Sequence, residues 1–86
     1  MNKLRAIIVE DEKPARDLIR AYLENFPKVE VIGEYDNGFD GLKAINELKP
    51  GAIFLDVQMP KLTGFEMLEV LEHHPEVVFT TAYDQY

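Results

Sequence analysis

The chain has 86 residues and carries 16 acidic against 9 basic side chains, a formal charge of −7 at pH 7, without any cysteine. These numbers exclude a disulfide framework and a thiolate metal site, and they argue against nucleic-acid binding, which depends on Lys and Arg at phosphates. Hydrophobic residues make up 47% of the chain, so we expect one small packed domain over residues 1–86. No apolar run approaches the ~18 residues of a membrane-spanning helix, and the apolar stretch behind the basic start is too short for a signal peptide. We therefore expect a cytoplasmic protein.

The first part of the chain predicts a strand, a helix and a second strand. Residues 5–9 form a short β-branched run that stops at acidic residues, which is typical of a strand buried on both faces of a parallel sheet. After Pro14, apolar residues recur at intervals of three and four as far as Phe26, which indicates an amphipathic helix that Pro27 closes. Residues 29–35 then favour a strand.

The alternation of strands and helices continues along the rest of the chain. The remaining predicted elements are, in order, a turn at residues 36–38, a helix over residues 39–48, a strand over residues 52–55, a helix containing Phe65, Leu68 and Leu71, and a strand over residues 77–79. Strands that alternate with helices indicate a parallel sheet with helices on both faces. The sequence therefore predicts the α/β class.

Polar side chains follow three of the predicted strands: Glu10 and Asp11 after the first, Asp56 after the third and Thr81 after the fourth. Because the carboxyl ends of parallel strands share one edge of a sheet, we expect these groups to lie close together. Crowded carboxylates need either a shared proton or a hard cation, and oxygen ligands suit Mg²⁺. Acids at such positions can also simply cap a helix, as we expect of Glu12. Asp56 instead follows an apolar strand and precedes a loop, so it is a candidate nucleophile that could form an aspartyl phosphate.

Three segments together resemble a response-regulator receiver domain. They are residues 7–12 (Ile-Ile-Val-Glu-Asp-Glu), residues 54–60 (Phe-Leu-Asp-Val-Gln-Met-Pro) with Gly64 following, and residues 79–84 (Phe-Thr-Thr-Ala-Tyr-Asp). The last segment, with Pro-Ala-Arg at residues 14–16, is especially similar to receivers of LytTR-type transcriptional regulators. The resemblance implies a flavodoxin-like, doubly wound parallel sheet and a module of two-component signalling. Such a module takes a phosphoryl group from a histidine kinase and is not otherwise an enzyme.

The resemblance also implies which residues bind the metal and the phosphoryl group. Asp56 matches the phospho-acceptor. Asp11, Asp56 and the backbone carbonyl of Gln58 match the protein ligands of Mg²⁺, and Glu10 matches the neighbouring acid that assists through water. Glu10 stands where many relatives have Asp.

Signalling roles fall on the residues behind the last predicted strand. Thr81 matches the switch hydroxyl that contacts the attached phosphoryl group, with the backbone N–H of Ala82 beside it. Gln58 and Tyr83 match positions that tune the rate of dephosphorylation. A phosphoryl group adds about −1.5 to −2 charges and strong acceptor oxygens, which would draw such a hydroxyl toward it.

Receiver domains have five strand–helix units, so the resemblance implies that residues 1–86 are a partial receiver domain. The fourth helix, fifth strand and fifth helix are missing, and with them the lysine that pairs with the phosphoryl oxygens. We expect Lys61, His73 and His74 to be ordinary surface residues. The open edge of the last strand predicts a homodimer or swapped assembly, and the full protein is expected to carry a C-terminal LytTR-type DNA-binding domain.

Two alternative functions remain at this point. One is a Mg²⁺-dependent phosphohydrolase with an Asp nucleophile, although such enzymes usually place a second acid two residues further on, where this chain has Gln58. The other is a receiver fragment that cannot be phosphorylated and acts only in self-association.

Overall fold

The computed structural model describes residues 3–56, 66, 69 and 75–80. The elements are, in chain order, β1 (Leu4–Val9), α1 (Lys13–Leu23), β2 (Val29–Tyr35), α2 (Gly38–Leu48), β3 (Ala52–Leu55) and β4 (Glu76–Phe79). Glu66 and Glu69 are helical, whereas Phe65, Leu68 and Leu71 of the predicted third helix lie outside the described residues. No helix in the described part of the chain combines the length and the apolar character needed to cross a membrane.

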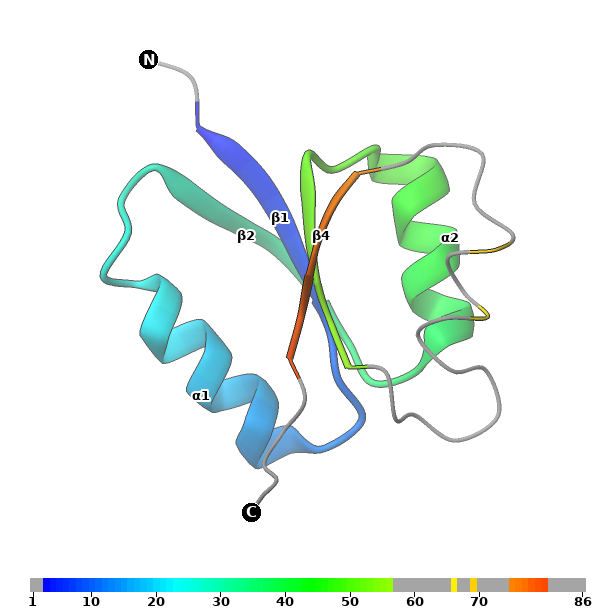
Figure 1. Ribbon diagram of the computed structural model, residues 1–86, viewed down its shortest axis with the longest axis horizontal. Helices are drawn as coiled ribbons and strands as arrows, with labels where there is room; N and C mark the ends of the chain where they lie inside the picture. The colour runs from blue at the N-terminus through cyan, green and yellow to red at the C-terminus, as the bar shows by residue number, and fades with distance from the viewer. Residues whose placement is uncertain (1–2, 57–65, 67–68, 70–74, 81–86) are drawn as a thin grey trace.

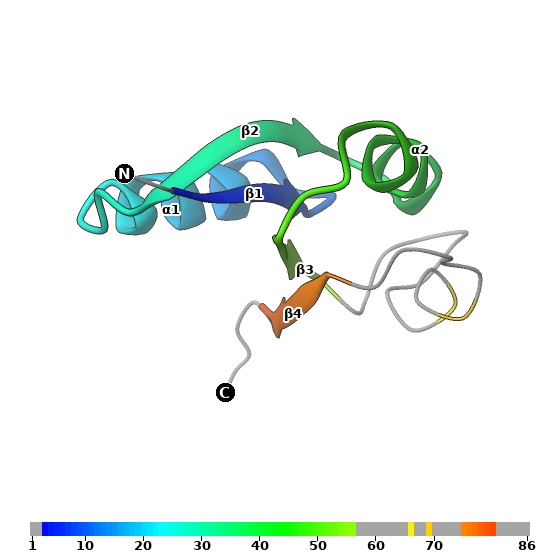
Figure 2. The same cartoon turned by 90° about the horizontal axis from the view of Figure 1, so that it is seen from above.

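The strands form one parallel sheet in the order β2-β1-β3-β4. The chain moves from β1 to β2 on one side and then crosses to β3 on the other, so the winding direction reverses between β1 and β3. In Figure 1, α1 and α2 lie on opposite sides of the sheet, and Figure 2 shows β1 between β2 and β3. The predicted doubly wound α/β architecture is therefore confirmed.

The hydrophobic core follows from the composition of β1 and β3. Residues 6–9 in β1 are all fully buried, because this strand has a neighbour on each edge and a helix over each face. Ile7 and Ile53 pack with Ala44 and Ile45 of α2 in the main cluster. Side chains of opposite parity, such as Ile8, point toward the α1 face, as alternation along a strand requires.

α1 begins and ends at positions that local chemistry explains. Pro14 lies in its first turn, as predicted, and Glu12 is its N-cap residue, but the Glu12 side chain makes no capping hydrogen bond. The helix ends at Leu23 rather than at Phe26. The N–H of Phe26 donates to the carbonyl of Leu23 at 2.9 Å, a tightened final turn. The predicted helix was too long because the α conformation is disfavoured at Phe26, the residue before Pro27.

α2 has clear signals at both ends. The Asn37 side chain accepts a hydrogen bond from the backbone N–H of Asp40 at 2.8 Å and so caps the first turn. At the other end, Lys49 adopts a left-handed conformation with φ of 47° and donates its N–H to the carbonyl of Ile45 at 2.9 Å. These two ends direct the chain from β2 across the sheet to β3.

Candidate metal and phosphoryl site

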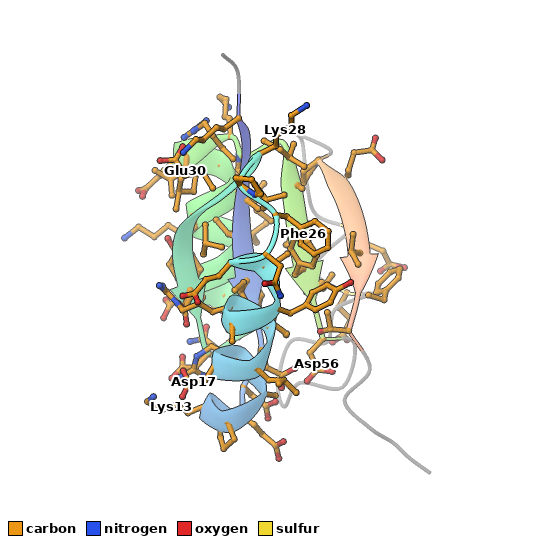
Figure 3. All side chains as sticks on the ribbon, turned by 90° about the vertical axis from the view of Figure 1, so that its left-hand side faces the viewer. Lys13, Asp17, Phe26, Lys28, Glu30 and Asp56 are labelled. Atoms are coloured by element: carbon orange, nitrogen blue, oxygen red, sulfur yellow. The ribbon has the colours of Figure 1, made fainter. Side chains whose placement is uncertain are left out.

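Three carboxyl groups meet at the carboxyl ends of β1 and β3, where the winding of the sheet reverses. One oxygen from each of Glu10, Asp11 and Asp56 lies within 4.8 Å of the other two. Glu10 is 1% exposed and Asp56 is 4% exposed, while Asp11 is only partly buried. Figure 3 shows Asp56 at the lower end of the sheet, at the same end as the start of α1. The predicted convergence of these acids is confirmed.

The backbone around the cluster is held by hydrogen bonds that continue the sheet. The N–H of Asp56 donates to the carbonyl of Val9 at 2.9 Å, which ties the end of β3 to the end of β1. On the other side, the N–H of Glu10 donates to the carbonyl of Tyr35 at 3.0 Å and ties β1 to β2. The Glu12 N–H also donates to Oε2 of Glu10 at 3.3 Å. The two buried carboxyl groups are therefore positioned by main-chain bonds from three strands.

Electrostatics make Glu10 the unusual member of the cluster. Burial first, and then the hydrogen bond and the negative charge of Asp56, together raise the pKa of Glu10 from 4.5 to about 8. The N–H of Glu12 favours the ionised form but does not compensate. The second carboxyl oxygen of Glu10, Oε1, is buried without a hydrogen-bond partner among the described residues. Without a cation, Glu10 is therefore largely protonated at neutral pH.

These donors fit a hard divalent cation. All three are carboxylate oxygens, neither cysteine nor histidine belongs to the cluster, and a buried oxygen is left for a further bond. Mg²⁺ typically takes one or two carboxylates and keeps several waters. A cation among the three acids would also relieve their mutual repulsion, which is about 4 kcal/mol for two unit charges 4 Å apart at an effective dielectric constant of 20. Glu10, Asp11 and Asp56 could therefore hold Mg²⁺.

Four predicted site residues lie outside the described part of the chain: Gln58, Thr81, Ala82 and Tyr83. Lys61, His73 and His74, which we expected to be ordinary surface residues, lie outside it as well. Thr80, directly before the predicted switch hydroxyl, is described. Its N–H donates to the carbonyl of Leu55 at 2.9 Å, and its Oγ1 is buried without a hydrogen-bond partner among the described residues.

One contact at this site was not predicted from the sequence. The Arg16 side chain reaches back from α1, and its Nη1 donates to the backbone carbonyl of Glu10 at 2.9 Å. The only signal in the sequence is that Arg16 and Arg20 lie four residues apart and so share one stripe of the helix. That spacing indicates a common direction but not a partner on another element.

Comparison with known proteins decides the family. The profile of the response regulator receiver domain matches residues 6–86. The chain belongs to this family. An uncharacterized response regulatory protein from Vibrio cholerae is 49% identical over 85 residues, which cover 96% of this chain and 36% of that protein. The transcriptional regulatory protein BtsR from Escherichia coli K12 is 41% identical over 85 residues, with the same shares of 96% and 36%.

A solved receiver structure agrees with the fold. The signal receiver domain of the response regulator NarL from Mycobacterium tuberculosis matches 99% of this chain with a TM-score of 0.87 and 26% identity, and the match covers 71% of that chain. The flavodoxin-like receiver fold predicted for this chain is thus confirmed. This receiver chain spans about 36% of the length of the curated relatives it matches.

Proposed function

We propose that this receiver domain accepts a phosphoryl group from a histidine kinase on Asp56, with Mg²⁺ held by Glu10, Asp11 and Asp56. The observation that carries the proposal is the buried three-carboxyl cluster at the point where the sheet winding reverses, with oxygens within 4.8 Å of one another. In open α/β sheets, ligands bind at this edge. Membership of the receiver family supports a histidine kinase as the phosphoryl donor.

The transfer requires few groups from the protein. An oxygen of ionised Asp56 forms a bond to phosphorus while the bond from phosphorus to the kinase histidine breaks. The histidine nitrogen keeps the electron pair, and the product is an acyl phosphate. Catalysis of this kind depends on positioning and charge neutralisation. The hydrogen bond from the Asp56 N–H to Val9 fixes the nucleophile, and bound Mg²⁺ supplies positive charge for the phosphoryl oxygens.

Other residues would respond to the negative charge of the attached phosphoryl group. We propose that the Thr81 hydroxyl and the N–H of Ala82 bind the attached phosphoryl group, that Gln58 supplies a backbone carbonyl to the metal, and that Gln58 and Tyr83 tune its loss. The parent protein is proposed to be a cytoplasmic transcriptional regulator with a C-terminal LytTR-type DNA-binding domain. The transcriptional name of BtsR supports this regulatory role. Residues 1–86 would then be a partial receiver without further enzymatic activity.

The test is phosphorylation by acetyl phosphate with Mg²⁺, followed by intact-mass measurement. We expect a single phosphoryl mass shift in the wild type and in Asp17→Asn, an exposed acid on α1, and no shift in Asp56→Asn. Wild type without a shift, together with a shift in a version extended as in the relatives, would support the non-phosphorylatable fragment instead. Multiple turnover of a phosphate ester would support the phosphohydrolase.

We also propose that two copies of this chain associate through an apolar face of α1 and β4. Leu18, Tyr22, Phe26 and Val78 are 72%, 61%, 43% and 45% exposed. The rings of Tyr22 and Phe26 pack at a tilt of 57° with centroids 5.2 Å apart, and the Phe26 side chain lies beside the upper part of α1 in Figure 3. A groove of about 420 Å³ runs between the helix and the sheet, lined by Leu18, Ile19, Tyr22, Phe54, Val78 and Thr80. None of these described lining residues is charged.

The size of this face suits a second copy. Aromatic side chains bury about 150–250 Å² each when fully covered, and Leu and Val bury less. The exposed parts of these four therefore amount to roughly 400–500 Å² per copy. Two copies would bury about 800–1,000 Å², the size of a weak or transient interface. The formal charge of −7 on each copy opposes association, so added salt should strengthen it.

Sedimentation velocity at several concentrations tests the dimer. We expect a concentration-dependent dimer that Leu18→Glu abolishes. Leu4→Glu, at a residue 43% exposed but outside this face, should leave the dimer intact. A monomer at all concentrations would contradict the proposal and would leave the face to chain beyond these residues, whereas equal loss in both variants would point to added charge alone.

A further inference from the structure

Arg16 makes a bridge between α1 and the carboxyl ends of two strands. Its side chain is 17% exposed, although it carries a full positive charge. Its Nη1 donates to the carbonyl of Glu10 at 2.9 Å, and its Nε lies 4.0 Å from Oε1 of Glu34 on β2. Glu34 is 19% exposed and also forms an ion pair with Arg20. The guanidinium therefore connects α1, β2 and the residue that follows β1.

The backbone that Arg16 holds is the part of the site with least support from regular structure. Residues 10–12 belong to neither a strand nor a helix, yet they carry two of the three clustered acids. One oxygen from each of Glu10, Asp11 and Asp56 lies within 4.8 Å of the other two, and repulsion between these groups when they are ionised favours opening of this segment. The N–H of Glu10 is fixed to Tyr35, and Arg16 fixes the carbonyl of the same residue. Both main-chain groups of Glu10 are thus anchored.

We propose that Arg16 is a positioning residue. By donating a hydrogen bond from α1 to the Glu10 carbonyl, it holds the carboxyl groups of residues 10 and 11 close to Asp56. The proposal rests on the proposed function for its link to Mg²⁺. An arginine is suited to the role because its planar, permanently charged fork can donate to a carbonyl and face a carboxylate at once. A lysine offers one compact ammonium on a flexible stem, so it would satisfy one partner at a time.

Arg20 provides a matched control. It lies one turn further along α1 and pairs with the same Glu34, but no hydrogen bond from Arg20 to Glu10 is found in the described structure, and its side chain is 51% exposed. Replacing Arg20 removes an equal charge from the same helix and the same acidic partner. Arg16 is the more buried of the two arginines, and it alone donates to the Glu10 carbonyl among the described contacts.

The experiment measures Mg²⁺ affinity by isothermal titration for wild type, Arg16→Gln, Arg16→Lys and Arg20→Gln. Loss of a group that orients metal ligands typically weakens metal binding by about 10–100-fold, and we expect at least the lower figure for R16Q. R16K should lie between R16Q and wild type, and R20Q should remain close to wild type. Wild-type affinity in R16Q, or an equal loss in R20Q, would overturn the proposal.

Amide hydrogen exchange provides a readout that needs no metal. In metal-free protein, R16Q should accelerate exchange at the N–H groups of Glu10 and Glu12 relative to Ile8 in the buried part of β1, whereas R20Q should not. If the wild type binds no Mg²⁺, the proposed function fails, and exchange alone decides the role of Arg16. Unchanged exchange in R16Q would then refute it. R16K keeps the test valid should R16Q fail to fold.

Discussion

Removing the charge of Glu10 should change how the stability of the metal-free protein depends on pH. Burial, together with the neighbouring Asp56, raises the pKa of this carboxyl from 4.5 in the unfolded chain to about 8 in the folded protein. Between these values the folded state binds a proton that the unfolded state has released, so stability falls as pH rises. Stability from this group is fully present below pH 4.5 and is lost progressively up to about pH 8. The slope is up to about 1.4 kcal/mol per pH unit.

Glu10→Gln, a neutral substitute of the same shape, should remove this slope. We expect E10Q and wild type to be similarly stable at pH 5, and E10Q to be more stable at pH 7.5 by about 3 kcal/mol, from the slope above. Because Asp56 contributes to the raised pKa, the proton belongs to the pair, and Asp56→Asn should flatten the same curve.

Urea unfolding in chelator at pH 5, 6, 7 and 8 measures the effect. Glu30→Gln, the same substitution at an exposed position of β2, should keep the wild-type slope. Saturating Mg²⁺ should stabilise the wild type more at pH 7.5 than at pH 5, since a cation binds the ionised cluster. If E10Q and wild type showed the same dependence on pH, the assignment of the buried proton to Glu10 would be wrong.

Three further changes test the packing and the ends of α2. Ile45→Ala, at a fully buried position, should lower the free energy of unfolding in urea by about 3 kcal/mol because it leaves a cavity, and a loss below 1 kcal/mol would mean that the site collapses. Asn37→Ala removes the cap bond to Asp40 and should cost about 1 kcal/mol, whereas Asn37→Asp should retain most of it. Lys49→Gly should instead raise the free energy of unfolding by about 1 kcal/mol, because φ is 47° there and glycine adopts positive φ without strain. A loss of stability would show that the Lys49 side chain makes a contact that outweighs the relief of this strain.

Local patterns in the sequence were enough to predict the strands and helices and the edge where the acids meet. The buried run of β1 and the alternation of elements require a parallel sheet, because such strands need cover on both faces. Since parallel strands end at one edge, Glu10, Asp11 and Asp56 had to lie near one another. The end of α1 was the least accurate prediction, because the periodicity of Tyr22 and Phe26 continues past the point where the backbone leaves the helix.

The tertiary structure decided what depends on two elements meeting at a particular angle. Adjacent acids look alike in the sequence, yet Glu10 is buried against Asp56 while Asp11 is only partly so, and this difference raises the pKa of one of them. The hydrogen bond from Arg16 to the Glu10 carbonyl likewise depends on how α1 lies across β1 and β2. Periodicity reports which face of an element is apolar, because that is a local property of the chain. Which polar group reaches which backbone atom is set only when separate segments pack.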